Sequence, residues 1–439
     1  MGTSVQRGCC KHRPEDHVTS KSILVVGDGP VPHDYMNYRA DVLVRYLALR
    51  TKHTVEILCP PPTQRRSDLD LAEGYPDVRF SYLPSSDPVS GFVSAVRRMV
   101  TVGSTVAHIR RILNSGRVDC IRTISSAPTV AAVLARGRRQ IPIVANLSDF
   151  YGDLYTGSRL PLAWIAVHLI AIVERLCSRA DVVIVDSPFQ RARWGKRGVV
   201  QDRCVVLPHG LPRTTPAVVR PSPGCLTDLR LSLRLAPDEK LAVHLGDVGE
   251  MDGVDILVGA LGALRREGKP VSLLVIGDGT PRYMRELEKI VERCGLRQNY
   301  FQIREVRNDE LPLLLSQCDV CVAPFRLRDT SMTAIQNKVL EYLTVDVPIV
   351  ATRSEALEWA LGDAVCLVDP ENEKALSSAV WDAIKDSTMS RHQMKRRNAI
   401  RQSLEWADLL LTEIAIIEGV FCETTPRWNR WDFEPSRAV

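Results

Sequence analysis

The chain has 439 residues, of which 45% are hydrophobic and 25% charged, and its net charge is +5. This composition is typical of an ordinary soluble globular protein with two or three domains. The mild charge comes without a zinc-finger, basic-zipper or RNA-binding sheet motif, so we predict that nucleic acid is not a partner.

Residues 1–20 are polar and lack the apolar core of a signal peptide, so we expect a disordered tail. The cysteines are scattered through apparent strands and helices, as at Cys120, Cys204 and Cys366. That distribution indicates buried thiols in a reducing compartment. We therefore expect a cytoplasmic protein.

Strands and helices alternate over residues 21–211, which predicts a first domain with a mainly parallel, doubly wound sheet. We predict strands at Ser22–Gly27, Thr54–Leu58, Val78–Leu83, Cys120–Ile124, Ile141–Ala145, Asp181–Val185 and Val205–Pro208. The loop Gly27–Pro32 resembles the start of a dinucleotide fingerprint. Proline stands where the third glycine should allow close packing, so nicotinamide binding is disfavoured.

Leu160–Val173 is apolar but shorter than the roughly 20 residues that a spanning helix needs, and we predict a buried helix. Arginines are frequent from Arg97 to Arg139. They are either solvated helix faces or a basic patch that attracts anionic lipid headgroups. The second interpretation allows association with the cytoplasmic face of a membrane.

The segment 212–237 is rich in proline and predicts a linker between the domains. His209, just before it, either faces the cleft or makes a structural hydrogen bond. The alternation resumes over residues 238–400, a second domain. We predict its strands at Leu241–Leu245, Val271–Ile276, Tyr300–Arg304, Cys318–Pro324 and Pro348–Thr352. Residues 401–425 predict a last helix, and 426–439 a loose tail.

A loop, an amphipathic helix and a buried strand follow one another from Thr330 to Thr352. Thr333 can cap the helix, and Lys338 and Glu341 share one of its faces. In an open α/β sheet, ligands lie beyond the carboxyl ends of the strands. Lys338 is then placed to meet an anionic diphosphate, and Glu341 to accept two hydrogen bonds from a ribose diol. The alternative is a solvated surface pair.

The NKxxEY segment formed by Asn337, Lys338, Glu341 and Tyr342 follows a polar loop, and with it the chain resembles a family 4 glycosyltransferase. The resemblance implies a GT-B fold, in which two Rossmann-like domains face each other across a cleft and a C-terminal helix returns to the first domain. It also implies transfer of a sugar from a UDP- or GDP-linked donor to an acceptor hydroxyl, with retention of the anomeric configuration. The resemblance further implies that the transfer needs no metal or other cofactor.

The resemblance further implies roles for individual residues. We expect Asp149, Lys338 and Glu341 to be catalytic, and Asp149 and Asp153 to lie on the acceptor side, although both acids could simply stabilise turns. Donor contacts are expected from the glycines, cations and polar residues that follow the strands: Gly27, Gly29, Gly246, Gly249, Gly277, Arg326, Arg328, Thr333 and Asn337. The two arginines could instead be free surface side chains.

Three departures from the family pattern bear on activity. Ser148 stands where the resembled subgroup has a histidine, and Thr333 where many members have a glutamate. The loop Gly246–Gly253 carries Asp247, Glu250 and Asp252, which would repel a diphosphate and must turn outward or contact hydroxyls. Two alternatives therefore stay open: a non-catalytic GT-B protein that binds a nucleotide or a partner subunit, and a GT-B sugar-nucleotide epimerase.

Overall fold

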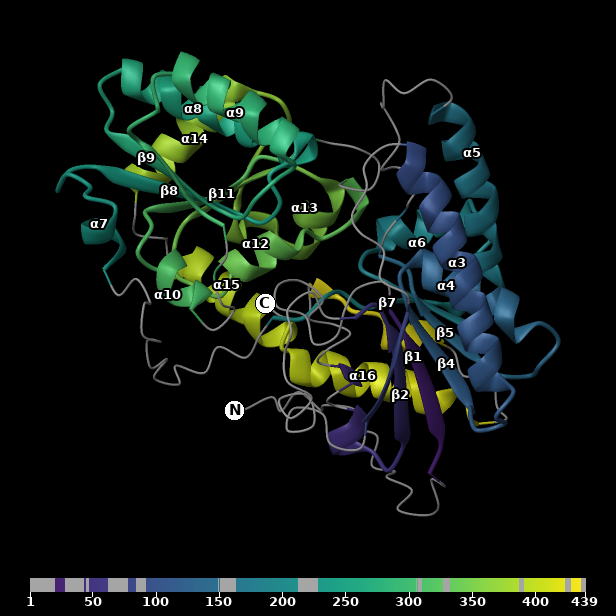
Figure 1. Ribbon diagram of the computed structural model, residues 1–439. Coiled ribbons are helices and arrows are strands. Elements are labelled where there is room, and N and C mark those ends of the chain that lie inside the picture. Colours follow the sequence, from purple (N-terminus) through teal and green to yellow (C-terminus); the bar gives the residue numbers. More distant parts are fainter. Residues whose placement is uncertain are drawn as a thin grey trace, which may run out of the picture.

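In a computed structural model, the chain forms two α/β domains, and Figure 1 shows the second domain at the upper left and the first along the right-hand side. The described residues are 20–27, 43–44, 47–61, 78–83, 92–148, 150, 163–211, 228–304, 306, 310–326, 332–386, 391–422 and 428–435. Residues 1–19 of the predicted tail lie outside them.

The first domain is built on a seven-stranded parallel sheet with the order β3-β2-β1-β4-β5-β6-β7. Its strands are β1 (Ser22–Val26), β2 (Thr54–Cys59), β3 (Val78–Tyr82), β4 (Cys120–Ile124), β5 (Ile143–Asn146), β6 (Val182–Val185) and β7 (Cys204–Val206). Every residue of β4, β5 and β6 is buried, so these strands are covered on both faces of the sheet, and the polar residues in them, Arg122, Thr123 and Asn146, are buried too. The predicted strands are confirmed, with small shifts at their ends.

Helices cover both faces of this sheet. The longer ones in the first domain are α3 (Phe92–Leu113), α4 (Ser126–Arg136), α5 (Ala163–Glu174) and α6 (Pro188–Gly195), and the 3-10 helix η2 (Arg175–Arg179) continues α5. Ser187 starts α6, because its side chain accepts a hydrogen bond from the N–H of Gln190 and Pro188 fits the first turn. This capping places Ser187 just beyond the carboxyl end of β6.

The second domain has a six-stranded parallel sheet with the order β10-β9-β8-β11-β12-β13. Its strands are β8 (Lys240–Leu245), β9 (Val271–Ile276), β10 (Tyr300–Ile303), β11 (Val320–Ala323), β12 (Ile349–Thr352) and β13 (Cys366–Val368). Its helices are α7 (Leu229–Ser232), α8 (Val254–Arg266), α9 (Pro281–Arg293), α10 (Leu311–Leu315), α12 (Asn337–Tyr342), α13 (Glu355–Leu361), α14 (Glu373–Lys385) and α15 (Arg391–Ser403).

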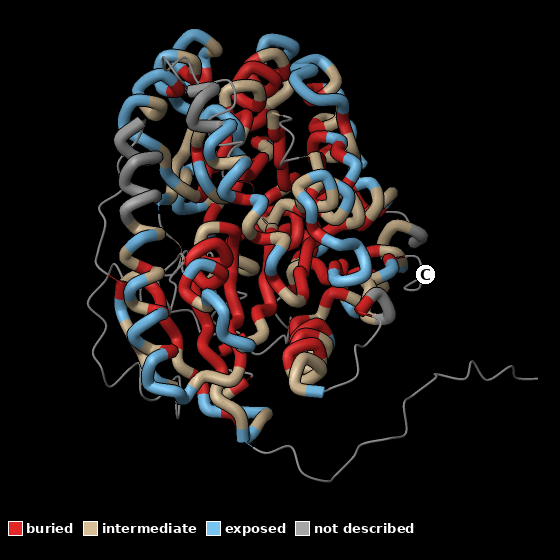
Figure 2. Tube along the Cα trace, turned by 90° about the vertical axis from the view of Figure 1, so that its right-hand side faces the viewer, coloured by how far each residue is buried: buried red, intermediate tan, exposed pale blue. Residues whose placement is uncertain are grey.

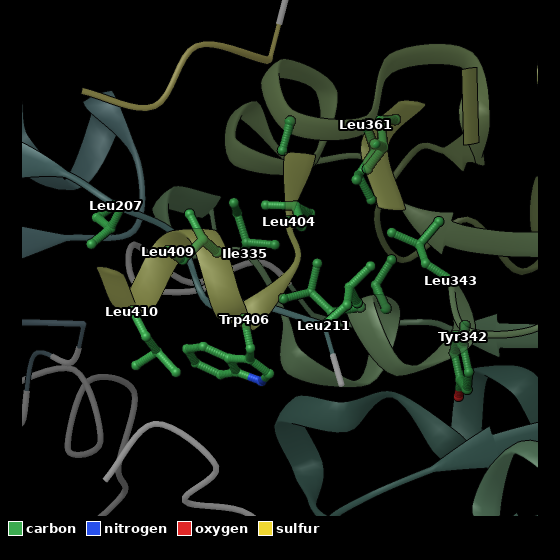
Figure 3. Close-up of a cluster of buried hydrophobic side chains, with 14 of the residues drawn as sticks. Leu207, Leu211, Ile335, Tyr342, Leu343, Leu361, Leu404, Trp406, Leu409 and Leu410 are labelled. Carbon is green, nitrogen blue, oxygen red and sulfur yellow. The ribbon is translucent and has the colours of Figure 1, made fainter. Parts of the chain in front are cut away.

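The last long helix, α16 (Trp406–Gly419), returns to the first domain as predicted. The carboxylate of Glu413 is paired with Arg122 of β4 inside the protein, with the two side chains 1% and 0% exposed. Figure 3 shows Trp406, Leu409 and Leu410 of α16 in one apolar cluster with Leu207 of the first domain and Leu343 of the second. The helix therefore braces the two domains.

The two chain crossings between the domains lie side by side. Leu211 and Glu405 form a parallel β-bridge, in which the N–H of Leu211 donates to the carbonyl of Leu404 at 2.6 Å. Gly210 lies so close to Trp406 that an added Cβ would stand 2.6 Å from the indole ring. The chain thus leaves the first domain and comes back to it through one shared joint.

Three predictions from the sequence are wrong. The predicted buried helix exposes Leu169, Ile172 and Val173 by 46%, 58% and 40%, because α5 lies on the outside of the first domain, the side that faces the viewer in Figure 2. The predicted loose tail contains a packed turn around Trp428, which is 7% exposed. Cys366 is an exposed thiol, because β13 is an edge strand.

Among the helices formed by described residues, none combines the length and the hydrophobicity that crossing a bilayer requires.

Candidate functional site

The helix α12 begins at Asn337, so the prediction that Thr333 caps it is wrong. The residue before the first turn is Gln336, whose side chain makes no capping hydrogen bond. Thr333 has a different partner, because its carbonyl accepts a hydrogen bond from the hydroxyl of Ser187. This contact ties the segment before α12 to the carboxyl end of β6 in the first domain.

Tyr342 fixes the position of α12 on its own sheet. Its hydroxyl accepts from the N–H of Leu245 at 2.8 Å and donates to the carbonyl of Val322 at 3.2 Å. Burial raises the pKa of Tyr342 well above its ordinary value, so the hydroxyl keeps the proton that the second bond needs. Leu245 ends β8 and Val322 lies in β11, so α12 stands at the carboxyl ends of these strands.

Lys338 is 6% exposed and points into a small polar cluster. Its ammonium nitrogen lies 2.7 Å from Oδ1 of Asp252, 3.5 Å from Nε2 of His244 and 4.9 Å from the ring centre of Phe325. Burial, with Lys338 adding to it, lowers the pKa of His244 well below its ordinary value. His244 is therefore neutral, and its Nε2 can accept from the ammonium while Nδ1 donates to a carbonyl.

Asp252 overturns the expectation that the acids of its loop turn outward. Asp247 and Glu250 are exposed, but Asp252 turns inward to Lys338 because the buried ammonium needs a counter-charge. Its second oxygen accepts from the N–H of Gly249 at 3.1 Å. The N–H of Gly246 donates to the carbonyl of Ile276 at 2.8 Å. Both glycine N–H groups that we expected to face a donor thus already have partners inside the protein.

Glycines allow the loops around this cluster to pack closely. Gly277 has φ of 143°, and an added Cβ would stand 2.0 Å from the carbonyl oxygen of Gly246. Gly253 has φ of 65°, and its Cβ would stand 1.7 Å from the carbonyl oxygen of Pro324. Larger residues at these positions would push the loops apart. This close packing is a better reason for glycine at the two positions than a direct contact with a ligand.

Glu341 lies one turn after Lys338 and is half-buried. Within the part of the chain that the structure describes, no hydrogen bond or ion pair of its carboxyl group is seen. Burial raises the pKa of Glu341 to about 7, and the charge of Lys338 opposes part of that rise. A carboxyl group without a partner at this depth is costly, and a ligand that donates hydrogen bonds would relieve the cost.

Arg326 is bound within the protein. Its guanidinium makes two hydrogen bonds to Asp255, at 2.6 and 2.8 Å, and one to the carbonyl of Glu250. It also lies 3.2 Å from the carboxylate of Glu371. The arrangement fastens the loop after β11 to the start of α8. Arg326 is therefore neither the free surface arginine of one interpretation nor an uncommitted cation for a diphosphate.

Several predicted site residues lie outside the described residues: Gly29, Asp149, Asp153 and Arg328. Two further predicted residues are described. Gly27 directly follows β1 and donates its N–H to the carbonyl of Leu58 at 3.0 Å, and Asn337 is half-buried at the first position of α12.

A second polar cluster, which the sequence indicated only in part, lies beyond β5, β6 and β7 of the first domain. The hydroxyl of Ser148 is 2.8 Å from Oδ1 of Asn146 and 3.3 Å from Oδ1 of Asp186. The same oxygen of Asp186 lies 3.6 Å from Nε2 of His209. Asp186 and Asn146 are each 2% exposed, and the amide nitrogen of Asn146 has no hydrogen-bond partner among the described residues. His209 thus has a buried carboxylate as its neighbour, which favours the structural role over a side chain directed into the cleft.

Two parallel-sheet domains, joined by paired crossings and braced by a returning C-terminal helix, define a GT-B protein. Residues 239–386 match the family model described as glycosyl transferases group 1, and residues 36–210 match a glycosyl transferase 4-like domain. The chain belongs to the family 4 glycosyltransferases.

Two named proteins are moderately similar to this chain in sequence. A GDP-mannose-dependent alpha-(1-6)-phosphatidylinositol monomannoside mannosyltransferase from Mycobacterium tuberculosis is 26% identical over 340 residues, which cover 76% of this chain and 81% of the relative. The putative colanic acid biosynthesis glycosyl transferase WcaI of Escherichia coli is 29% identical over 188 residues, covering 40% of this chain and 44% of the relative.

Solved structures share the fold at lower identity. A sucrose-phosphate synthase from Thermosynechococcus elongatus has a TM-score of 0.74 at 18% identity, covering 92% of this chain and 100% of its own. The Anabaena protein HepE, solved in complex with UDP and glucose, has a TM-score of 0.65 at 17% identity, covering 90% of this chain and 99% of its own.

Proposed function

We propose that this glycosyltransferase moves a sugar from a GDP-linked donor to an acceptor hydroxyl, with retention of the anomeric configuration and without a metal ion. The observation that carries the proposal is the pair formed by Lys338 and Glu341 at the carboxyl ends of β8 and β11. The GDP-mannose dependence of the mycobacterial relative supports guanosine as the base and mannose as the first sugar to test.

The leaving diphosphate makes the main physical demand on such a site. Lys338 supplies a positioned ammonium in a setting with little water, where charge stabilisation is strong. Glu341 accepts hydrogen bonds from the two ribose hydroxyls, and this satisfies its lone carboxyl group. The diphosphate has to replace Asp252 as the partner of Lys338, so binding includes a switch of one ion pair.

The acceptor lies on the side of the first domain. Ser148, Asp186 and His209 offer donors and acceptors of hydrogen bonds there, and Asp149 and Asp153 follow Ser148 closely in the sequence. The hydrogen bond from Ser187 to Thr333 supports this arrangement, because it brings the end of β6 against the segment before α12.

One assay series tests the proposal. The purified protein is incubated with GDP-mannose or UDP-glucose, with and without EDTA, and with a panel of sugar and lipid acceptors. We expect turnover of GDP-mannose that EDTA leaves unchanged and a product of the same anomeric configuration by NMR. Lys338→Ala should abolish nucleotide binding, whereas Lys374→Ala, which alters an exposed lysine of α14, should not.

Other outcomes support the alternatives. Nucleotide binding without turnover of any donor would indicate a non-catalytic GT-B subunit. A changed sugar-nucleotide in the absence of an acceptor would indicate an epimerase. Inversion of the anomeric configuration would refute the retaining mechanism but not the sugar transfer itself.

A further inference from the structure

The exposed face of α5 is unusual for a helix of a globular protein. Leu169, Ile172 and Val173 are neighbours at i, i+3 and i+4, and each exposes 40% or more of its surface. The other exposed large hydrophobic residues in the described part of the chain are separated from one another in sequence. Contiguous apolar patches of this kind mark interaction sites.

Basic residues directly follow this apolar patch. Arg175 and Arg179 of η2 are exposed, and Arg175 continues the stripe that His168 and Ile172 begin at i and i+4. Glu174 is turned away, since it is 3% exposed and its carboxylate lies 3.2 Å from the guanidinium of Arg197. The outward side of α5 and η2 therefore presents apolar and positive groups, with its acid withdrawn into the protein.

Three arginines of the predicted basic patch are engaged within the protein. Arg110 donates to the carbonyl of Leu134, Arg136 is paired with Asp181 at 2.6 Å, and Arg139 donates to Asn114. These arginines fasten helices to one another and to the sheet. The positive charge next to the apolar patch thus comes from η2, a segment that we did not single out in the sequence.

We propose that α5 and η2 dock the protein on the surface of a bilayer rich in anionic phospholipid. The helix of 12 residues is roughly 18 Å long, too short to span a bilayer but suited to lie in its interface. The apolar side chains enter the acyl boundary, and the two arginines contact lipid phosphates. Docking here leaves α16 and the joint between the domains free, because α16 packs on the other face of the sheet.

Vesicle co-sedimentation tests the proposal. The full chain is mixed with vesicles of phosphatidylcholine alone, or of phosphatidylcholine with an equal amount of phosphatidylglycerol, at low and at high salt. We expect binding only to the mixed vesicles and release by salt. Arg175→Gln with Arg179→Gln should lower the partition coefficient roughly thirtyfold. Ile172→Ser should also weaken binding, through the lost apolar insertion.

Matched controls lie in the second domain. Leu231→Ser changes a leucine that is 74% exposed, and Arg266→Gln with Arg285→Gln removes two exposed arginines. These variants should bind vesicles like the original chain. Absence of binding to mixed vesicles, or equal loss in test and control variants, would overturn the proposal. So would a dimer in sedimentation velocity that Ile172→Ser dissociates, since the face would then belong to a second copy.

Membrane docking through α5 and η2 does not depend on the proposed sugar transfer, and different measurements test the two. Thermal-shift titration with GDP on the same variants should give unchanged affinity, because neither α5 nor η2 contributes to the cluster around Lys338. A protein that binds vesicles but transfers no sugar would contradict the function alone.

Discussion

At the scale of single residues, Lys338 is the centre of the site and already has an anionic partner. The sequence placed Lys338 and Glu341 on one helix by spacing alone. It could not show that Asp252, 86 residues earlier, would turn inward to the same ammonium. A pairing of that kind depends on where two loops meet in space, and a local pattern does not contain it.

Asp252→Asn should raise the affinity for GDP by about tenfold. The substitution removes the charge that competes for Lys338, and a hydrogen bond to a charged group is worth about 1.5–3 kcal/mol. Isothermal titration calorimetry measures the change. Asp247→Asn is the matched control, because Asp247 is exposed in the same loop and should change the affinity much less. Equal effects of the two variants would argue against a phosphate-binding role for Lys338.

Glu341 predicts a specific dependence of stability on pH. Its pKa rises from 4.5 to about 7 on folding, so the folded state holds the proton more tightly. The contribution of this tighter proton binding to the stability of the folded protein is complete below about pH 4.5 and is lost as the pH rises through about 7. Glu341→Gln should have the melting temperature of the original chain at about pH 4.5 and exceed it at about pH 8. A constant difference across this range would refute the raised pKa.

The affinity for GDP should show the opposite dependence on pH. The ionised carboxylate offers a strong acceptor oxygen to each ribose hydroxyl, whereas the protonated group keeps one weaker acceptor, so the affinity for GDP should increase as the pH rises through about 7. Glu341→Gln should bind more weakly and lose most of this dependence. Titrations with guanosine, which has the ribose but no phosphate, separate the effect of Glu341 from that of Lys338.

At the scale of elements, the strands were predictable and the short helices were not. Residues Cys120–Ile124 and Val271–Ile276 are buried on both sides, and their mostly apolar, short sequences indicate such strands even though Arg122, Thr123 and Ser272 interrupt them. The segment before α12 is instead held by Ser187 of the other domain, whose hydroxyl donates to the carbonyl of Thr333, and no local pattern contains that contact. The prediction that α5 is buried was wrong for a related reason. An apolar sequence predicts burial, but it does not contain the neighbouring segment that would have to cover the helix.

Tyr342→Phe tests how α12 is held. The variant leaves the N–H of Leu245 without the hydroxyl and takes a donor from the carbonyl of Val322. We expect a loss of about 1–3 kcal/mol in the free energy of unfolding and a weaker affinity for GDP, since Lys338 moves with the helix. Urea denaturation and calorimetry measure the two effects. Tyr283→Phe, which removes a 3.0 Å hydrogen bond to Asp255, is a control for loss of a tyrosine hydroxyl elsewhere.

At the scale of the whole molecule, the two domains are connected in three ways: the paired crossings at Leu211 and Glu405, the contact from Ser187 to Thr333, and the helix α16. The first domain holds α16 by a buried ion pair. Arg122 donates through Nε to Glu413 at 2.8 Å, and neither side chain is more than 1% exposed. Two charges at this depth stabilise the protein only as a pair.

Glu413→Gln should therefore lower the free energy of unfolding by about 3–5 kcal/mol, because the guanidinium of Arg122 stays buried without its counter-charge. Arg122→Met combined with Glu413→Leu should regain most of that loss, since two apolar residues of similar volume suit the same place. Urea denaturation of the original chain, Arg122→Met, Glu413→Leu and the combined variant, which form a double-mutant cycle, gives the coupling energy. If the losses simply added, α16 would be held by its apolar face alone, and the pair would contribute nothing to the union of the domains.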